Sequence, residues 1–379
     1  MDILIVTQDF PPERGGIQTY VLELARAFLA RGHKVRVICP GRESDPDPLL
    51  HGGRGLADLV RLPIHSSWLF LRLLTYLPRY LKRNPSVEAV LYAQWQPALA
   101  ELLLPGSRRK HRSYCLVHGR ELLTSVLGPL APPLMRLAFG RMRAAFPNSA
   151  EVLRMTRTRA APACPLHLVH PGVDPEHFRP VDAGFLRDRY GFDGNGTRTP
   201  IVYCITRMVA RKNLLTLVEA MPGVRAEVPG AVLLLAGDGP EKASLVNRAQ
   251  ALGLGEGVRF LGRIADAEMV AHYCLADVFA LPSMSLPRDI EGFGIVFLEA
   301  GACEVPVVGS LAGGIPDAVE AGVTGLLVPP EDGQKLKDAL VELLKNRARA
   351  REMGQCARIR IEKGFTWAHA ADRILAFMS

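Results

Sequence analysis

The sequence lacks the long apolar runs and the leader segment that mark membrane-spanning and secreted proteins. No stretch of about 18 apolar residues is free of charge, so a membrane-spanning helix is not expected. The first residues, MDILIVTQDF, read directly as a strand, without the basic region and small-residue cleavage site of a secretory signal. We therefore expect a cytoplasmic protein.

Paired cysteines and the common catalytic signatures are also missing. The seven cysteines are odd in number and none forms a Cys-x-x-Cys pair, so we expect buried thiols in a reducing compartment. There is no zinc-type Cys/His pattern, Walker lysine loop, Gly-x-Ser-x-Gly elbow or complete Gly-x-Gly-x-x-Gly fingerprint; Gly237-Asp-Gly239 supplies only part of the last. Asp45 and Asp47 have a metal-binding spacing, but the Pro-rich SDPDP around them indicates a solvated turn. No metal site is predicted.

What the sequence does contain is a globular composition with an excess of positive charge. With 48% hydrophobic and 22% charged residues, a chain of 379 residues is long enough for two domains with separate cores. The formal net charge of +8 favours an anionic partner, which could be nucleic acid, a membrane surface or a phosphorylated small molecule. Charge alone does not choose among these three.

Strand-like and helix-like segments alternate along the chain. A β-branched run at 3–7 precedes a helical pattern at 18–30, which Gly32 is placed to end, and 35–39 is a second apolar strand. The same order recurs later, with strands expected at 201–206, 232–236 and 278–281 and helices at 213–220 and after Gly294. Such alternation predicts parallel, doubly wound sheets with helices on both faces.

Two stretches rich in Pro, Gly and Asp, HPGVDPEHFRP and DGNGTRTP, separate the two series of elements. Stretches of this composition are typical of domain boundaries. We therefore expect two Rossmann-like α/β domains, at 1–172 and 173–364. Ligands of open α/β sheets bind at the carboxyl ends of the strands, so a cleft between the domains is the expected site.

Turns suited to a phosphorylated ligand follow several of the predicted strands. Gly15 and Gly16 open a helix and would let the backbone approach an anion closely, although a tight turn would need the same residues. Arg207 and Lys212 follow the strand IVYCIT. Two cations at this turn could neutralise a diphosphate, or they could belong to a solvated basic loop.

The segment EGFGIVFLEA, residues 291–300, places two carboxylates at another such turn. Gly292 and Gly294 lie outside the expected helix, so Glu291 precedes the helix and Glu299 lies about one turn inside it. A helix N-terminus attracts anions, because its first N–H groups are unpaired and its dipole is positive there. The two carboxylates leave that helix end open between them.

Taken together, these motifs resemble the retaining glycosyltransferases of the GT-B fold, in family 4. The resemblance covers nearly the whole chain, through DFPPERGGIQTYVLELARAFLARGHKVRVI, PNSAEV, HPGVDPEHFRP, TRMVARKN, LLLAGDGPE, VRFLGRI and EGFGIVFLEAGACEVPVVGSLAGGIPDAVEAGVTGLLVPPED. The paired-glutamate motif of the family matches Glu291 and Glu299. The family usually has glycines where Thr206 and Asn213 flank the Arg207 to Lys212 segment here.

The resemblance implies sugar transfer, with retention and without a metal or other cofactor, from a nucleotide diphosphate sugar. Glu299 would bind the ribose and Glu291 the transferred sugar, while Arg207 and Lys212 would stabilise the departing diphosphate. The residues implied in catalysis are Arg207, Lys212, Glu291 and His118. Those implied in donor binding are Gly15, Gly16, Arg207, Lys212, Gly292, Phe293, Gly294, Ile295 and Glu299.

Two further implications concern the N-terminal, acceptor-side domain. A C-terminal helix at 365–379 is expected to pack back on it. His118, in LVHGRE, resembles the histidine near the donor sugar, although it could equally be a hydrogen-bonded histidine at a strand end. No side chain presents itself as a covalent nucleophile, which suits the same-face displacement proposed for the family.

The segment SMSLPRDIEGFGIVFLEA, which includes Arg288 and Asp289, narrows the choice of donor sugar. This stretch resembles bacterial mannosyltransferases that act on lipid-linked or glycolipid acceptors, so GDP-mannose is the first expected donor. UDP-glucose and UDP-N-acetylglucosamine remain alternatives, as do a sugar-nucleotide epimerase and a non-catalytic nucleotide-sugar binder on the same fold. A glycan or lipid-linked acceptor is expected, and nucleic acid is not.

Residues 65–85, HSSWLFLRLLTYLPRYLKRNP, combine a helical apolar pattern with positive charge only. One interpretation is a core helix, which Pro78 should break or kink. The other, which we favour, is an interfacial segment on an anionic membrane. Its apolar side chains would lie among acyl chains (Trp68, Leu69, Leu73, Tyr76 and Leu77), and its cations would face acidic head groups (Arg72, Arg79, Lys82 and Arg83).

Overall fold

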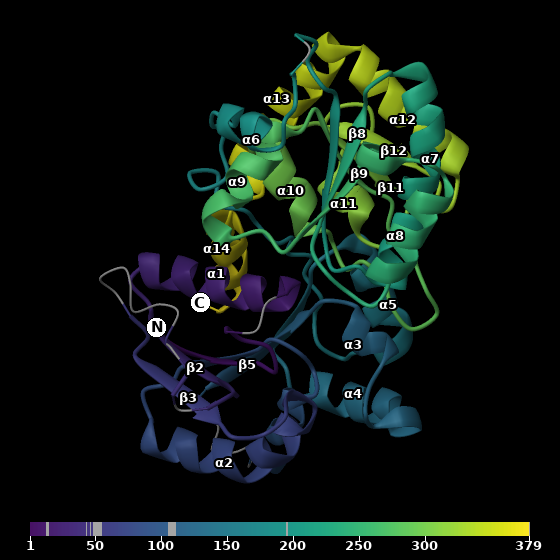
Figure 1. The fold of residues 1–379 in the computed structure, drawn as a ribbon. Coiled ribbons are helices and arrows are strands. Elements are labelled where there is room, and N and C mark those ends of the chain that lie inside the picture. The colour runs from purple at the N-terminus through teal and green to yellow at the C-terminus, as the bar shows by residue number, and fades with distance from the viewer. Residues whose placement is uncertain are drawn as a thin grey trace. The chain divides into compact units, whose positions relative to one another are not determined.

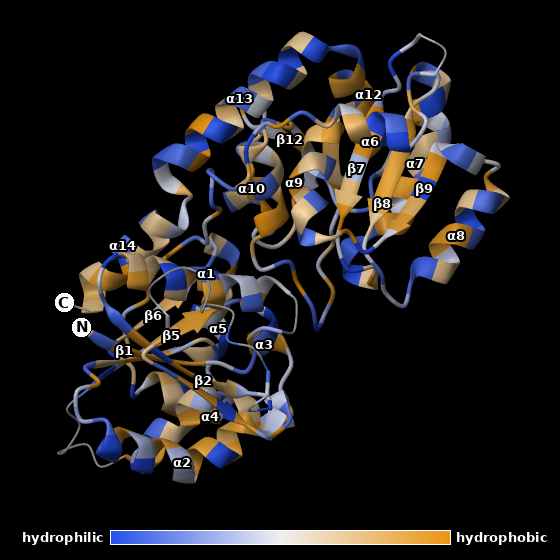
Figure 2. Ribbon diagram, turned by 60° about the vertical axis from the view of Figure 1, so that its left-hand side comes forward, coloured by the Kyte–Doolittle hydropathy of each residue, from blue (hydrophilic) through white to orange (hydrophobic). Residues whose placement is uncertain are grey.

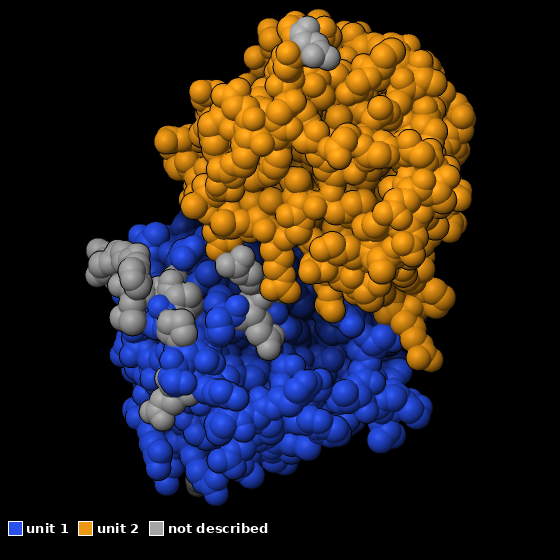
Figure 3. Space-filling view, in the orientation of Figure 1, with its two compact units in different colours: residues 1–172, 367–379 blue, residues 173–366 orange. Residues whose placement is uncertain are grey.

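The structure is a computed structural model that describes residues 1–12, 15–42, 44–45, 47, 55–104, 111–194 and 196–378. It divides into two compact units, which Figure 3 shows in different colours. Unit 1 comprises Met1–Gly172 and Trp367–Ser379, and unit 2 comprises Val173–Thr366. Unit 2 therefore extends to Thr366 rather than ending at the expected residue 364.

Unit 1 is built around a six-stranded parallel sheet in the order β3-β2-β1-β4-β5-β6 (Figure 1). Its strands are β1 (Asp2–Val6), β2 (Lys34–Pro40), β3 (Asp58–Leu62), β4 (Ala89–Tyr92), β5 (Arg112–Val117) and β6 (Ala144–Pro147). Its helices are α1 (Gly16–Ala30), α2 (Leu69–Arg83), α3 (Arg120–Leu123), α4 (Ala131–Phe139), α5 (Ala150–Ala160) and α14 (Trp367–Met378). Short 3-10 helices are η1 (Ser66–Trp68), η2 (Pro97–Leu103) and η4 (Gly128–Leu130).

Unit 2 repeats this plan with a six-stranded parallel sheet in the order β12-β11-β10-β7-β8-β9. Its strands are β7 (Ile201–Ile205), β8 (Val232–Ala236), β9 (Val258–Gly262), β10 (Val278–Leu281), β11 (Val307–Ser310) and β12 (Gly325–Val328). Its α-helices are α6 (Gly184–Arg189), α7 (Leu214–Glu227), α8 (Lys242–Ala251), α9 (Asp266–Leu275), α10 (Ile295–Ala302), α11 (Ile315–Ala318), α12 (Gly333–Lys345) and α13 (Arg347–Gly364). The 3-10 helices are η5 (Ala210–Lys212) and η6 (Gly255–Gly257).

The central strands of both sheets are buried on both faces, and Figure 2 shows them as hydrophobic ribbons between helices. Parallel strands covered by helices on both sides read as continuous apolar runs, as in DILIV of β1 and VLLLA of β8. The prediction of two doubly wound parallel sheets is confirmed. Strands β8 and β10 have the predicted bounds, whereas α7 continues past the predicted end at 220, through Pro222, to Glu227.

The C-terminal helix α14 belongs to unit 1, where it packs against α1. The Arg31 side chain at the end of α1 donates from Nη2 to Asp372 Oδ2 at 2.7 Å. The ring of Tyr20 meets the Trp367 ring edge to face, with centroids 5.3 Å apart. Gly32 follows α1 with φ of 78°, which is the left-handed conformation expected of a glycine that ends a helix.

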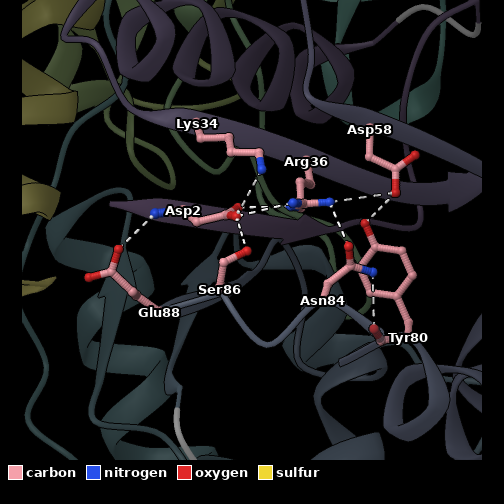
Figure 4. Close-up of polar contacts among 8 residues, drawn as sticks. All are labelled: Asp2, Lys34, Arg36, Asp58, Tyr80, Asn84, Ser86 and Glu88. Carbon is pink, nitrogen blue, oxygen red and sulfur yellow. Dashed lines mark hydrogen bonds and ion pairs between the residues drawn. The ribbon is translucent and has the colours of Figure 1, made fainter. Parts of the chain in front are cut away.

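A polar network joins the amino ends of the unit 1 strands to the end of α2 (Figure 4). The buried Arg36 side chain donates from Nε to Asp2 Oδ1 and from Nη1 to Asn84 Oδ1, each at 2.8 Å. The Tyr80 hydroxyl donates to Asp58 Oδ2 at 2.6 Å. Because Tyr80 lies on α2, and Asn84 directly after it, these bonds fix this helix against the sheet edge.

Helix α2 packs three of its leucines into the core, and this corrects one prediction. Leu69, Leu73 and Leu77 are fully buried, so they do not lie among acyl chains. Pro78 lies inside the helix without ending it. The outward face of α2 is cationic, since the exposed charged residues are Arg72, Arg79, Lys82 and Arg83.

The cysteines carry free thiols. All are buried except Cys274 and Cys356, which are half-buried, so the prediction of buried thiols holds for the others. Within the ranges given above, none of the helices combines the length and apolar character that a bilayer crossing requires.

Candidate functional site

The N-terminus of α10 is shaped by a glycine that cannot be replaced without strain. Gly294 precedes Ile295 with φ of 90°, and a Cβ atom there would lie 2.7 Å from the Phe297 ring. No side chain caps this end; the Phe297 N–H donates to Gly294 O, and the N–H groups of Ile295 and Val296 have no side-chain cap. As predicted, Glu291 precedes the helix and Glu299 lies about one turn inside it.

Glu291 is held by two cations that follow β7. Lys212 Nζ and Arg211 Nη1 each lie 2.5 Å from Glu291 Oε2, and Ser283 Oγ donates to the same oxygen at 3.3 Å. Burial opposes ionisation of this carboxyl, but the two cations lower its pKa to about 2. Among the described residues these bonds all use Oε2, which leaves Oε1 able to accept a hydrogen bond from a ligand.

Arg211 is a site residue that the sequence analysis missed. Its Nε lies 3.2 Å from Asp289 Oδ2, so this guanidinium bridges Asp289 and Glu291. Only 15% of its side chain is exposed, which fixes the bridge in place. The sequence did offer one signal for Arg211. Two carboxylates, at 289 and 291, lie close together and need more than one nearby cation to balance their charge.

Arg207 lies on an exposed turn that a Gly-Asp-Gly segment supports. A Cβ atom at Gly237 would lie 2.0 Å from Thr206 O, and one at Gly239 would lie 2.3 Å from Met208 O. Only glycines allow this close approach of two backbones, so the partial dinucleotide motif positions the Arg207 turn. No side-chain bond of Arg207 is seen among the described residues, which leaves its charge open to an anion.

A second pair of glycines fixes the backbone of Glu291. Gly313 has φ of 56°, and a Cβ atom there would lie 2.2 Å from Glu291 O. Gly314 N donates to the same carbonyl at 2.8 Å. These contacts hold the segment before α10 against the turn that follows β11.

Asn213 accounts for one departure from the family pattern. It has φ of 50°, in the left-handed region where a glycine is normally favoured. Asparagine tolerates this conformation better than most side chains. The left-handed backbone that a glycine would favour is therefore present at Asn213, directly after Lys212.

Glu299 is bound by Tyr273, which the sequence analysis also missed. The Tyr273 hydroxyl, on α9, donates to Glu299 Oε2 at 2.5 Å. Burial raises the pKa of Glu299, and the Tyr273 hydrogen bond opposes this shift. Burial also raises the pKa of Tyr273, so its hydroxyl remains a donor.

In unit 1, Gly15 and Gly16 lie at the start of α1, which no side chain caps. A Cβ atom at Gly16 would meet nothing within 4 Å, and Gly15 has an extended φ of 167°. The packing of the described residues therefore does not require a glycine at position 16. The residues directly before them, 13 and 14, lie outside the described part of the chain.

Buried polar atoms without partners gather at the carboxyl ends of β4, β5 and β6. His118 directly follows β5, Asn148 directly follows β6, and the Tyr20 ring lies 5.0 Å from the His118 ring. Among the described residues, the atoms without a hydrogen bond in this region are Tyr20 Oη, Gln96 Oε1, His118 Nε2, Glu121 Oε2 and Asn148 Oδ1. Such atoms cost roughly 1–3 kcal/mol each when unpaired, so their concentration here is typical of a polar ligand site.

The His118 side chain has a hydrogen bond to the backbone of Ala93, while its Nε2 has no partner among the described residues. Burial lowers its pKa to about 4, so the imidazole is neutral at pH 7. Its backbone N–H donates to Glu121 Oε1 at 2.6 Å, and burial raises the pKa of Glu121. A neutral imidazole nitrogen can accept a proton from a hydroxyl group.

Asp45 contacts the backbone of Arg42. Its Oδ2 accepts a bond from Arg42 N at 2.9 Å, within a turn whose residue 46 is outside the described chain. The side chain of Asp45 is 26% exposed, and since residues 46 and 48 lie outside the described part of the chain, the solvated turn stays a prediction. No group of three or more His, Cys, Asp or Glu residues with metal-binding geometry occurs in the described ranges.

Comparison with known proteins identifies the family. Residues 192–360 match the model for glycosyl transferases group 1, and residues 14–177 match that for glycosyltransferase family 4. The chain is 36% identical, over 99% of its length and 97% of the relative, to a GDP-mannose-dependent alpha-(1-6)-phosphatidylinositol monomannoside mannosyltransferase of Mycobacterium tuberculosis. A GDP-mannose-dependent monoacylated alpha-(1-6)-phosphatidylinositol monomannoside mannosyltransferase of Corynebacterium glutamicum is 31% identical, over 98% and 96%.

Solved structures share the fold. Sucrose-phosphate synthase from Thermosynechococcus elongatus superposes with a TM-score of 0.79 at 24% identity, covering 99% of this chain and 98% of that one. Anabaena HepE in complex with UDP gives a TM-score of 0.80 at 19% identity, covering 99% of both chains. The chain belongs to glycosyltransferase family 4 and is a glycosyltransferase of the GT-B fold.

Proposed function

We propose that this glycosyltransferase moves mannose from GDP-mannose to a lipid-linked or glycan acceptor, with retention of configuration and without a metal ion. The observation that carries the proposal is the 31–36% identity, over almost the whole chain, to relatives named as GDP-mannose-dependent mannosyltransferases. UDP-glucose and UDP-N-acetylglucosamine are the alternative donors that a test must exclude.

Unit 2 binds the donor in this proposal. The diphosphate faces the uncapped N-terminus of α10, where the N–H groups and the helix dipole favour negative charge. Arg207 supplies an exposed cation, and Lys212 supplies a second one beside Glu291. Glu299 accepts hydrogen bonds from the ribose hydroxyls through the oxygen that Tyr273 does not use.

The transferred sugar is held by Glu291. Its Oε2 is occupied by Arg211 and Lys212, so Oε1 accepts from a sugar hydroxyl. As the sugar departs from the diphosphate, negative charge grows on the phosphate oxygens, and fixed cations stabilise this charge most strongly in the transition state. No metal is needed for this purpose, because Arg207, Lys212 and the α10 amides supply the positive charge.

Unit 1 supplies the acceptor side. The buried polar atoms around His118 offer hydrogen-bond partners for hydroxyl groups, and the neutral imidazole can accept a proton. The cationic face of α2 would attract an anionic membrane, where a lipid-linked acceptor resides. The enzyme would then work at the cytoplasmic face of the cell membrane.

A thermal-shift panel of GDP, UDP and ADP sugars tests the donor. A ligand held at 100 times its dissociation constant adds about 2.7 kcal/mol to the stability, so one nucleotide should stand out. GDP-mannose should raise the melting temperature most, and NMR of the glycoside product should show the α configuration of the donor retained. A larger shift with UDP sugars would transfer the proposal to those donors, and release of free sugar and nucleotide without acceptor turnover would contradict it.

A further inference from the structure

Cys274, on α9 of unit 2, is a half-buried thiol between two polar backbone groups. Its sulfur donates to Arg179 O and accepts from Val181 N, each at 3.4 Å. A backbone N–H that points at a sulfur favours the thiolate, because it stabilises the negative charge. The segment that supplies both backbone groups precedes α6.

Cys303 is a buried thiol at the same place in unit 2. It directly follows α10, and α9 and α10 pack side by side (Figure 1). Arg358 donates from Nη1 to Ala302 O at 2.6 Å and to Phe178 O at 3.4 Å, so the end of α10 is joined to the segment that also contacts Cys274. The Cys303 thiol donates to the Cys274 sulfur. The two sulfur atoms are therefore neighbours.

The hydrogen bond between the two thiols makes them unequal. It lowers the pKa of Cys274, against the effect of partial burial, and it raises the pKa of Cys303. Burial raises the pKa of Cys303 further. Because the thiolate is the nucleophilic form, Cys274 is the reactive member of the pair. A partly exposed thiol of this kind, next to a second thiol that can resolve it, is typical of redox-sensing sites.

We propose that Cys274 and Cys303 form a reversible oxidation site for a hydroperoxide. The Cys274 thiolate attacks one peroxide oxygen, the O–O bond breaks, and the leaving oxygen takes up the proton that the thiol gave up. The product is a sulfenic acid at Cys274. The Cys303 sulfur then attacks the Cys274 sulfur, gives up its proton, and releases the sulfenic hydroxyl group as water.

The two steps oxidise two thiols to one disulfide, and hydrogen peroxide is reduced to two molecules of water. A dithiol reductant reverses the reaction by thiol–disulfide exchange. In the reducing compartment that the cysteine pattern predicts, such bonds are usually transient and redox-sensing. The site therefore adds to sugar transfer a chemistry that uses neither donor nor acceptor.

The disulfide would form beside the proposed ribose contact. Tyr273 precedes Cys274, and Glu299 lies about one turn before Cys303. The Tyr273 hydroxyl donates to Glu299 Oε2 at 2.5 Å. A covalent bond draws the two sulfurs closer than a hydrogen bond does, so the end of α9 moves with Tyr273 toward the end of α10. This consequence, unlike the thiol chemistry, rests on the proposed function.

Peptide mass spectrometry after treatment with hydrogen peroxide and alkylation tests the chemistry. The wild type should yield two peptides linked through Cys274 and Cys303, which dithiothreitol separates. Cys303→Ala should stop at the Cys274 sulfenic acid, which dimedone traps. Cys356→Ser, which removes the other half-buried thiol, should leave the linked peptides unchanged.

The wild-type measurement decides the proposal without any variant. The oxidation site is overturned if both cysteines of peroxide-treated wild type are alkylated, or if either one is linked to a different cysteine. It is equally overturned if folded Cys303→Ala protein gives no dimedone adduct at Cys274.

Calorimetric titration with GDP separates this inference from the proposed function. The oxidised wild type should bind GDP up to about tenfold more weakly than the reduced form, since a hydrogen bond to Glu299 is disturbed, and dithiothreitol should restore the affinity. Peroxide should not change GDP binding by Cys274→Ala. Equal affinities of the two wild-type forms, or a loss in Cys274→Ala, would overturn the link to Glu299. Absence of GDP binding by either form, with the disulfide formed, would reject the proposed donor instead.

Discussion

Lys212 and Glu291 form a buried ion pair, with Nζ and Oε2 2.5 Å apart. The lysine follows β7, and the glutamate precedes α10, so the pair joins two turns at the carboxyl edge of the unit 2 sheet. A cation proposed for the diphosphate and a carboxylate proposed for the sugar are therefore electrostatically linked. Loss of either one changes the state of the other.

Arg207→Ala and Lys212→Ala should differ in stability while both lose turnover. Loss of a charge contact to the departing diphosphate is worth roughly 2–4 kcal/mol, or about 30- to 1,000-fold in rate. Arg207 is exposed, so its removal should leave the melting temperature unchanged. Lys212→Ala should lower it, because Glu291 loses one of its two buried cations. Arg347→Ala, at an exposed position on α13, serves as the control and should keep normal turnover and stability. Near-normal turnover of both Arg207→Ala and Lys212→Ala would show that these residues do not bind the donor.

The two glutamates should separate nucleotide binding from sugar binding. Glu299→Ala should weaken free GDP and GDP-mannose alike, because it removes a ribose contact. Glu291→Ala should spare GDP and impair transfer. Tyr273→Phe removes only the hydrogen bond to Glu299 and should weaken GDP by less than Glu299→Ala does. Calorimetric titration of each variant measures these affinities, and equal losses of GDP affinity at 291 and 299 would refute the division.

Substitution of Gly237 should damage the Arg207 turn. Gly237→Ala places a Cβ atom 2.0 Å from Thr206 O at φ of 112°, so the backbone must move. Gly253→Ala is the matched control, since Gly253 has φ of 64° but nothing within 4 Å of its Cβ position. The control should lose roughly 1 kcal/mol of stability through backbone strain alone. Gly237→Ala should lose more stability than the control and should also lose turnover. Urea unfolding measures the stability, and initial rates measure the turnover. Equal losses in the two variants would show that the close approach at Gly237 is not important.

His118 should make stability depend on pH below neutrality. Its pKa is about 4 in the folded protein, against 6.5 as the ordinary value, because burial disfavours the cation. The unfolded chain therefore binds more protons between these values, and stability falls by up to about 1.4 kcal/mol per pH unit as the pH drops from 6.5 to 4. His118→Phe should remove this slope. Denaturant unfolding of the wild type and of His118→Phe between pH 6.5 and 4 gives the difference in stability at each pH. Contributions from other groups such as Glu121 cancel in this difference. A difference that does not change with pH would refute the buried neutral imidazole.

Chelation should leave transfer unaffected, because the proposal assigns the diphosphate charge to side chains and helix amides. Initial rates before and after treatment with EDTA provide the measurement. Asp45→Asn with Asp47→Asn should be equally neutral. A strict requirement for manganese or magnesium, lost in the double variant, would make those carboxylates metal ligands.

Much of the fold was readable because each central strand is a short apolar run bounded by turn residues. The start of α10 was readable for a similar reason, since Gly294 and the apolar residues after it mark a helix end. The contacts of Arg211 were not readable, because adjacent cations at 211 and 212 give no sign of which carboxylate each one meets. The role of Gly237 depends on a backbone brought near from another strand, which no local pattern contains.

Helix α2 shows a different limit of the sequence. Its leucines suit a lipid boundary and a protein core equally well, and the structure places Leu73 and Leu77 in the core. The spacing of apolar residues defines a helical face but not what covers it. Hydrogen bonds between Tyr80 and Asp58, and between Arg36 and Asn84, hold this helix against the unit 1 sheet.

The assignment of α14 to unit 1 bears on how the protein is made. Unit 2 is one continuous stretch, so the ribosome delivers all its strands without interruption. Unit 1 acquires the helix that pairs Asp372 with Arg31 only after unit 2 has been synthesised. The side of α1 that contacts α14 is therefore covered only after the strands of both units have been synthesised.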